Sequence, residues 1–64
     1  MARNYGSKRM TTAQLKAAMD MRLTLCTDWA LSRITVEELQ RNGFYRQEAE
    51  ERLRAERERR GMAA

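Results

Sequence analysis

The sequence predicts an all-α protein built from three helices: a long one, a short one and a long charged one. Three observations predict this fold class. The 64 residues contain no proline, and their apolar side chains recur at spacings of three and four. In addition, the pairs Thr11/Gln14 and Thr35/Glu38 have the spacing of a capping box, the polar pattern that begins a helix.

The first helix is predicted to begin at Thr11 and to run to about residue 32. Met10 and Leu15 occupy the positions of a hydrophobic staple around this start. Leu23 lies off the apolar face of the helix, and the polar residues around Thr27 would allow a break. The face expected to be buried consists of Leu15, Ala18, Met19, Leu25, Cys26 and Trp29.

The second helix is predicted to be short, from Val36 to Arg41, with Thr35 as its cap. Asn42-Gly43 ends it, because glycine readily takes the left-handed conformation that a Schellman end requires. Such an end also brings the residue after the glycine, Phe44, into contact with the last turn of the helix.

The third helix is predicted to run from Tyr45 to Arg60 and to end at Gly61. Its apolar stripe is narrow and consists of Tyr45, Ala49 and Leu53. The other positions are mostly charged, with glutamate four residues before arginine, a spacing that contributes about 0.2–0.5 kcal/mol per pair. The last two turns are therefore expected to project into solvent or onto a partner.

These elements define a flexible basic arm at residues 1–10, one helical domain at residues 11–61 and a tail at residues 62–64. A chain of this length forms a marginal core. With one cysteine and no histidine, it has neither an internal disulfide nor a zinc site to support that core, so we expect a homo-oligomer or a bound partner. The predicted core is Leu15, Met19, Leu25, Cys26, Trp29, Ile34, Leu39, Phe44, Ala49 and Leu53.

Charge and hydropathy limit the function classes. The net charge of +4 is concentrated in residues 1–34, since residues 35–64 contain seven arginines and seven glutamates. No apolar run approaches the length of about 20 residues that a membrane span needs, and no signal-peptide pattern is present. We therefore expect a cytoplasmic protein that makes no membrane contact.

An enzyme is not expected. Catalysis needs groups whose protonation or nucleophilicity is tuned by a water-poor site. Cys26 has no histidine to activate it, the glutamates of the third helix alternate with arginines, and no glycine-rich phosphate loop occurs. We expect no cofactor and no metal, so the protein should act by binding a macromolecule.

Residues 35–49, Thr-Val-Glu-Glu-Leu-Gln-Arg-Asn-Gly-Phe-Tyr-Arg-Gln-Glu-Ala, resemble the helix-turn-helix unit of small bacterial and phage regulators. The resemblance implies a dimeric regulator of transcription that binds double-stranded DNA, with the third helix in the major groove. Arg46 and Gln47 would then contact base edges. The positions that would pack the two helices together are Leu39, Gly43, Phe44, Ala49 and Leu53. The other candidates for DNA contact are Arg3, Lys8 and Arg9 of the arm, and Arg54.

The alternative is a protein-binding adaptor or inhibitor module that acts through the charged helix and an apolar face centred on Trp29. Interleaved glutamate and arginine are typical of helices that select a partner. The outward face of the third helix includes Glu51 and Glu58, which would repel phosphates. Trp29 is the candidate hot spot, with Arg54 and Glu58 as charged contacts. RNA is a third partner class, because arginines cluster near the end of the chain: Arg52, Arg54, Arg57, Arg59 and Arg60.

Overall fold

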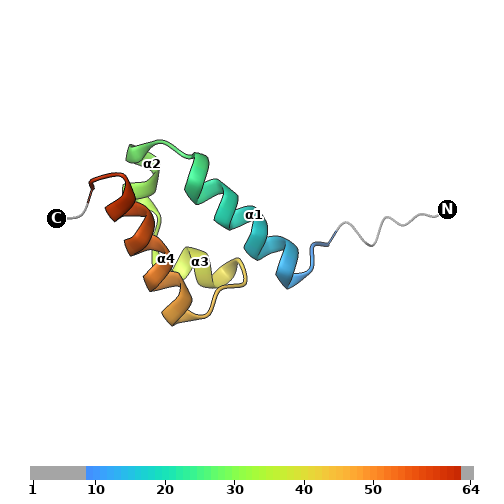
Figure 1. The fold of residues 1–64 in the computed structure, drawn as a ribbon. Coiled ribbons are helices and arrows are strands. Elements are labelled where there is room, and N and C mark those ends of the chain that lie inside the picture. The colour runs from blue at the N-terminus through green and yellow to red at the C-terminus, as the bar shows by residue number, and fades with distance from the viewer. Residues whose placement is uncertain (1–8, 63–64) are drawn as a thin grey trace.

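A computed structural model describes residues 9–62 of the protein (Figure 1). This part of the chain is all-helical, which confirms the predicted fold class. In Figure 1 the long helices α1 and α4 lie on opposite sides, with α2 near the upper end of both and α3 between them. The predicted residues of the arm up to Lys8, including Arg3, lie outside the described residues, as do residues 63–64 of the predicted tail. The helices are α1 (Thr12–Leu25), α2 (Asp28–Arg33), α3 (Val36–Arg41) and α4 (Arg46–Arg59).

The predicted first helix is divided in two, so the described residues form four helices where the sequence predicted three. Its start is confirmed: the Thr11 hydroxyl accepts from the amide of Gln14 at 3.1 Å, and the Gln14 side chain accepts from the amide of Thr11 at 2.9 Å. The prediction that this helix continues to residue 32 is wrong. The Thr27 hydroxyl accepts from the amide of Ala30 at 3.1 Å and begins a new helix, α2.

Helix α3 ends as predicted. Gly43 has a φ of +94°, and the amide of Phe44 donates to the carbonyl of Leu39 at 3.1 Å, which is a Schellman end. A Cβ atom at Gly43 would lie 2.9 Å from the backbone oxygen of Thr12, so glycine also lets this turn pack against the start of α1.

The start of α3 differs from the predicted capping box. The Thr35 hydroxyl accepts from the amide of Glu38 at 3.2 Å, as expected. The Glu38 carboxylate, however, accepts from Arg22 of α1 at 3.0 Å. This side chain therefore links α3 to α1, where the sequence predicted that it would complete the cap of its own helix.

The core has eight buried apolar side chains, and six of the ten predicted core residues are among them. Leu25 and Trp29 are wrong predictions, because they are 74% and 70% exposed. Leu23 and Leu31 are fully buried in their place. Leu23 lies four residues after Met19 and shares its buried face of α1, whereas the break at Thr27 gives α2 a separate buried face that contains Leu31. Of the other two predictions, Leu15 and Cys26 are half-buried. The core is Met19, Leu23, Leu31, Ile34, Leu39, Phe44, Ala49 and Leu53.

Helix α4 also departs from its predicted inner stripe. Tyr45 precedes the first turn and is 79% exposed. The last turns do not project into solvent, since Glu56 is only 3% exposed. Gly61 has a φ of +76° and the amide of Met62 donates to the carbonyl of Arg57 at 2.7 Å, so the helix ends in a second Schellman motif. Met62, which the sequence placed in the tail, packs against the core.

Among the described residues, no helix combines the length and the apolar character that a membrane crossing requires.

Candidate partner-binding surfaces

The outward half of α1 contains no charged residue, although charged residues make up 34% of the chain. The inward half contributes Met19 and Leu23 to the core. On the outward half, Met21 is 62% and Leu25 74% exposed. Depletion of charge together with exposed apolar side chains is typical of the centre of a protein interface. We call this surface the outer face of α1; its residues are Met10 just before the helix and Ala13, Gln14, Ala17, Ala18, Met21, Thr24 and Leu25.

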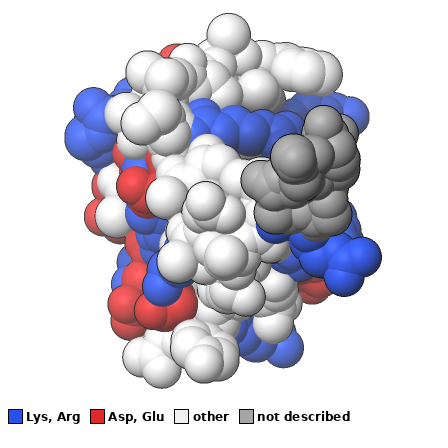
Figure 2. All heavy atoms as spheres, turned by 90° about the vertical axis from the view of Figure 1, so that its right-hand side faces the viewer, with Lys and Arg blue, Asp and Glu red and all other residues white. Residues whose placement is uncertain are grey.

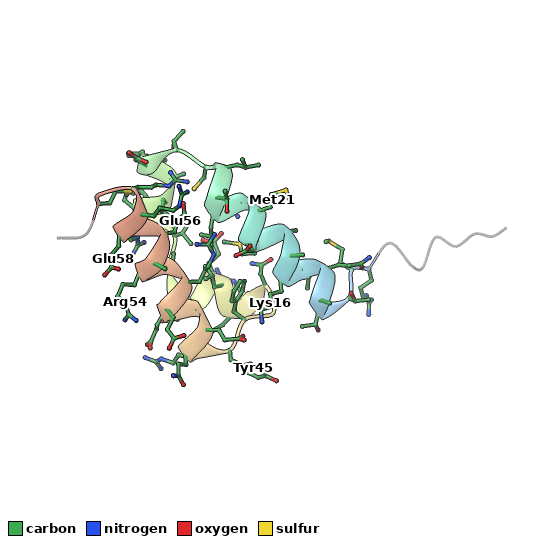
Figure 3. The ribbon with its side chains drawn as sticks, viewed as in Figure 1. Lys16, Met21, Tyr45, Arg54, Glu56 and Glu58 are labelled. Carbon is green, nitrogen blue, oxygen red and sulfur yellow. The ribbon has the colours of Figure 1, made fainter. Side chains whose placement is uncertain are left out.

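Figure 2 shows a broad field of uncharged atoms in the middle of the face of the molecule that is turned toward the viewer. Charged side chains gather at the two sides of this field, and a band of basic atoms crosses its upper part. In Figure 3 Met21 points away from the other helices, whereas Lys16 points toward α3 and α4. The helix therefore separates its charged border from its uncharged outer face.

The charged border of α1, formed by Lys16 and Asp20, makes ion pairs with side chains of α4. The ammonium group of Lys16 lies 3.0 Å from both carboxylate oxygens of Glu48, and it also lies 5.3 Å from the ring centre of Phe44. One turn further along α1, Asp20 accepts from Arg52. The hydrogen bond from Lys16 lowers the pKa of Glu48, with a smaller contribution from the amide of Tyr45. These pairs hold the charges of Lys16 and Asp20 at the edge of α1 that contacts α4.

Two shallow hollows on this side of α1 share Ala17 and, at the charged border, Asp20, which both line the two hollows. One continues toward Ala13 and Phe44, and the other toward Met21 and Leu25. Alanine leaves room above the helix backbone, so a partner side chain can enter between the larger methionine and leucine side chains.

Trp29 lies in the first turn of α2, beyond the end of the outer face of α1. Its ring is 70% exposed, and the guanidinium of Arg33 lies 5.0 Å from the ring centre, a cation–π distance. The predicted hot spot is therefore an exposed side chain. The prediction that Trp29 belongs to the core is wrong.

A groove of about 620 Å³ lies between α2, α3 and α4. Its apolar surface comes from Val36, Leu53 and Met62. Arg54 and Glu58, the two charged partner-binding residues predicted from the sequence, both line it, and Figure 3 shows them side by side on α4. Trp29 does not line this groove, so the structure brings two of the three predicted partner-binding residues together and leaves the third apart.

The residues predicted to read DNA lie at the exposed start of α4. There Arg46 donates to Glu50 and Gln47 donates to Glu51, each at 3.3 Å. Both side chains are therefore engaged by the glutamate one turn further along the helix. Arg9 is exposed just before α1, and Arg54 is exposed on α4.

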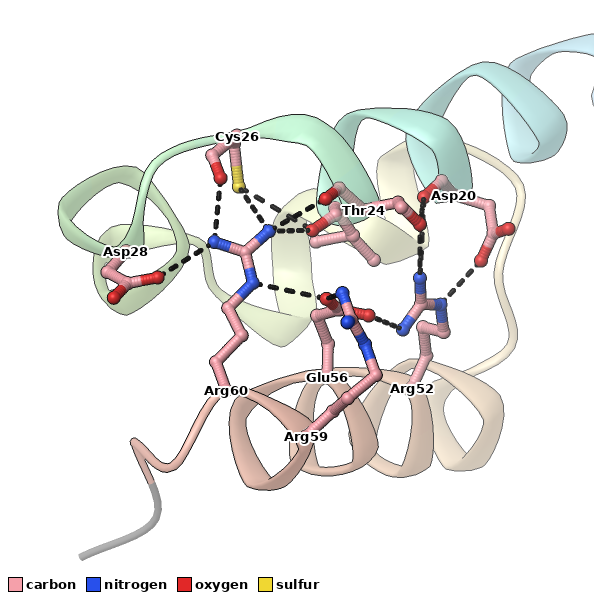
Figure 4. A network of polar contacts seen from close by, with 9 residues as sticks. Asp20, Thr24, Cys26, Asp28, Arg52, Glu56, Arg59 and Arg60 are labelled. Carbon is pink, nitrogen blue, oxygen red and sulfur yellow. Dashed lines mark hydrogen bonds and ion pairs between the residues drawn. The ribbon is translucent and has the colours of Figure 1, made fainter.

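The last turn of α4 forms a polar network that sequence reasoning missed (Figure 4). The guanidinium of Arg60 donates to the carbonyls of Leu23 at 2.8 Å, Thr24 at 3.0 Å and Cys26 at 2.6 Å. These carbonyls lie at the end of α1, where the helix leaves its last acceptors without an internal donor. Arg60 therefore caps α1 from a distant part of the sequence.

Arg57 has the same role at the end of α2. It donates to the carbonyl of Leu31 at 2.8 Å and to that of Ile34 at 2.7 Å. The sequence indicated only that glutamates precede arginines by four residues in this helix, and this spacing gave no indication that Glu56 or Arg60 is enclosed.

Glu56 is the acidic centre of the network. Its carboxylate accepts from Arg59, from Arg52 at 2.8 Å and from Arg60 at 3.1 Å. The hydrogen bond from Arg59 and then that from Arg52 lower its pKa from 4.5 to about 2, although burial acts in the opposite direction. Glu56 thus stays ionised while almost completely enclosed.

This network changes the interpretation of the arginine cluster. Of the five arginines that suggested RNA as a partner, Arg52, Arg57 and Arg60 make hydrogen bonds inside the fold. Arg54 and Arg59 are the two exposed members of the cluster, and Arg59 also pairs with Glu56. A phosphate-binding surface at this end of the molecule would therefore have few free cations.

Within residues 9–62, no group of three or more His, Cys, Asp or Glu side chains is placed to hold a metal ion. Comparison of the chain with protein-family models, with curated proteins and with solved structures found no match.

Proposed function

We propose that this protein is a protein-binding module without enzymatic activity, and that its contact surface is the outer face of α1. The observation that supports this proposal is the exposure of Met21 and Leu25 on a helix half without charge. Contiguous exposed apolar side chains in a small protein mark an interaction surface more often than single ones do. Trp29 extends the apolar surface past the end of α1 and supplies the type of side chain that commonly anchors interfaces.

The composition of this face favours a protein over nucleic acid. A phosphate-binding surface needs lysine or arginine side chains directed at the ligand. The basic residues of α1 are directed elsewhere: Lys16 pairs with Glu48, and Arg22 pairs with Glu38. Methionine suits a protein partner, because its flexible side chain adapts to the shape of an apolar surface.

The proposal is tested by retention of binding partners from a cell extract on the immobilised protein. We expect Met21→Glu to abolish retention of the bound protein, because the carboxylate would be buried without a partner. Gln40→Glu is the matched control, since it adds the same charge at an exposed position on α3. Equal retention by the wild type and by both variants would contradict the proposed surface.

DNA binding by a helix-turn-helix regulator is a second candidate function. It is favoured by the packing of α3 on α4, where Leu39, Phe44, Ala49 and Leu53 are all buried, as the resemblance implies for this unit. In this proposal, the start of α4 enters the major groove, and Arg46 and Gln47 leave their glutamate partners to contact bases.

Fluorescence anisotropy with duplex DNA separates the two functions. The DNA proposal expects micromolar or tighter binding that weakens steeply between about 50 and about 200 mM salt. It also expects Arg46→Ala and Gln47→Ala to reduce sequence discrimination, and Arg9→Ala to weaken binding to every duplex alike. The protein-binding proposal expects no micromolar binding at the lower salt concentration.

A further inference from the structure

We propose that the partner of the outer face of α1 is a second copy of this chain, packed with its α1 antiparallel and with a two-fold axis at Ala17. This inference rests on the proposed function and names the partner of the same surface. It is argued from the size and the charge of the residues along α1.

The outer face of α1 is complementary in size to its own antiparallel copy. A two-fold axis at Ala17 places Ala17 opposite Ala17 of the second copy and Ala13 opposite Met21 of the second copy. Each large side chain then meets a small one, which is the arrangement that fills space between packed helices. The same axis places Met10 opposite Thr24 and Leu25 opposite Arg9 of the second copy, so the contact extends from one end of the helix to the other.

The charges on the border of α1 also favour the antiparallel arrangement. Lys16 and Asp20 both lie on the border that contacts α4, since they pair with Glu48 and Arg52. A two-fold axis keeps these borders on the same side, and it brings Lys16 to within about 3 Å, along the helix direction, of Asp20 of the second copy. A parallel pair, whose two-fold axis runs along the helices, would place the two borders on opposite sides of the contact, so Lys16 and Asp20 would not meet across it.

The two charges remain accessible from outside. The side chain of Lys16 is 40% exposed and that of Asp20 is 53% exposed, so each keeps a free side while it pairs within its own chain. Across the interface they would form an alternating row of acidic and basic groups with Glu48 and Arg52.

The dimensions of α1 predict a weak dimer. Its 14 residues span about 21 Å. A contact of that length and of one helix width is smaller than the roughly 800 Å² per partner of a standard stable interface. We therefore expect reversible association at micromolar concentrations, driven by burial of the side chains that the monomer leaves exposed.

Sedimentation equilibrium between about 5 and about 500 µM protein measures this association, a range suited to a small interface. We expect the wild type to pass from monomer to dimer within this range. Met21→Glu should weaken association at least about tenfold, because it buries a carboxylate at the contact, and Gln40→Glu should leave it unchanged. A wild type that stays monomeric, or a Met21→Glu variant that dimerises normally, overturns the inference.

Disulfide cross-linking tests the direction of the helices. In a Cys26→Ala background whose helicity is first verified, we expect Ala17→Cys to form a covalent dimer on oxidation. Ala13→Cys and Met21→Cys should each fail to cross-link to themselves, because each is about 12 Å from its own symmetry mate along the helix. A mixture of these two variants should cross-link. Self-linking of Ala13→Cys as fast as Ala17→Cys overturns the antiparallel arrangement.

The failure of this inference differs from the failure of the proposed function. A monomeric wild type that still retains a different protein through Met21 removes the second copy as the partner but leaves the proposed function intact. A wild type that neither self-associates nor retains another protein contradicts both the inference and the proposed function.

Discussion

The outer face of α1 and the last turn of α4 both depart from the usual relation between polarity and burial. The apolar region is exposed to solvent, and the charged region is buried. On α1, the apolar side chains of Met21 and Leu25 are 62% and 74% exposed. On α4, the carboxylate side chain of Glu56 is 3% exposed, and Arg60 caps the end of α1. From composition alone, the outer face of α1 would be expected to be buried and the last turn of α4 to be exposed.

The difference shows that backbone groups as well as side chains decide which surface is buried. The helices α1 and α2 both end in the middle of the chain, and their last carbonyls need donors. Arg57 and Arg60 supply these donors, and Glu56 neutralises the charge that they bring. The outer face of α1 has no such requirement within the chain, so it remains available to a partner.

The largest expected effect is a difference in the free energy of unfolding between substitutions on the two faces of α1. Leu23→Ala should destabilise the fold by about 2–5 kcal/mol, because it leaves a cavity at a fully buried position. Leu25→Ala, two residues further along the same helix, should cost less than about 0.5 kcal/mol, because its side chain is exposed. Urea denaturation of dilute protein measures both variants. Equal losses of stability would remove the distinction between the two faces.

The next effect tests whether the arginines of α4 are structural. Arg60→Ala should lower the melting temperature by at least about 5 °C, because several carbonyls at the end of α1 lose their donor. Arg54→Ala removes an arginine that is exposed on the same helix, and it should lower the melting temperature by less than about 3 °C. Thermal unfolding followed by circular dichroism measures the pair, and a larger effect at Arg54 would contradict the capping role of Arg60.

The third effect is on acid stability. Glu56 has a pKa of about 2 in the folded protein against 4.5 as its ordinary value. The unfolded chain therefore takes up this proton at a higher pH than the folded one does, so the stabilisation is complete above about pH 4.5 and is lost as the pH falls toward 2. Glu56→Gln should flatten the decrease in stability across that range. A variant with the same acid profile as the wild type would show that other carboxylates determine it.

The smallest effect concerns the boundary between α1 and α2. Thr27→Ala should destabilise the fold by about 1 kcal/mol, because the amide of Ala30 loses its acceptor. Thr27→Ser keeps a hydroxyl at the cap and should cost much less. Chemical denaturation measures both variants, and equal costs would mean that the boundary does not depend on this hydrogen bond.

Features determined by neighbouring residues could be predicted from the sequence. The cap at Thr11, the glycine end at Gly43 and the burial of Leu39, Phe44 and Leu53 follow from spacing and residue type, and the structure contains all of them. The division of the first helix was harder to predict. The apolar residues on both sides of Thr27 fit one continuous periodic pattern, and a threonine can cap a helix or lie within it.

The candidate surfaces could be predicted only in part. The sequence indicated Trp29 as a contact residue, and the structure exposes it, but the sequence also placed Leu23 off the buried face of the first helix, and Leu23 is fully buried. Whether Leu31 faces inward depends on how α2 turns away from α1. That angle is set by contacts with α3 and α4, which come later in the chain.

The sequence by itself determined the all-helical class, the helix starts at Thr11 and Thr35 and the helix ends at Gly43 and Gly61. The physical reason is that caps and turns are made by hydrogen bonds between residues at most five apart. Only the tertiary structure decided that the charged end of α4 is enclosed and that one side of α1 is exposed. Arg60 reaches the carbonyl of Leu23 across 37 positions of the chain, and no local pattern of residues encodes a contact between groups that only folding brings together.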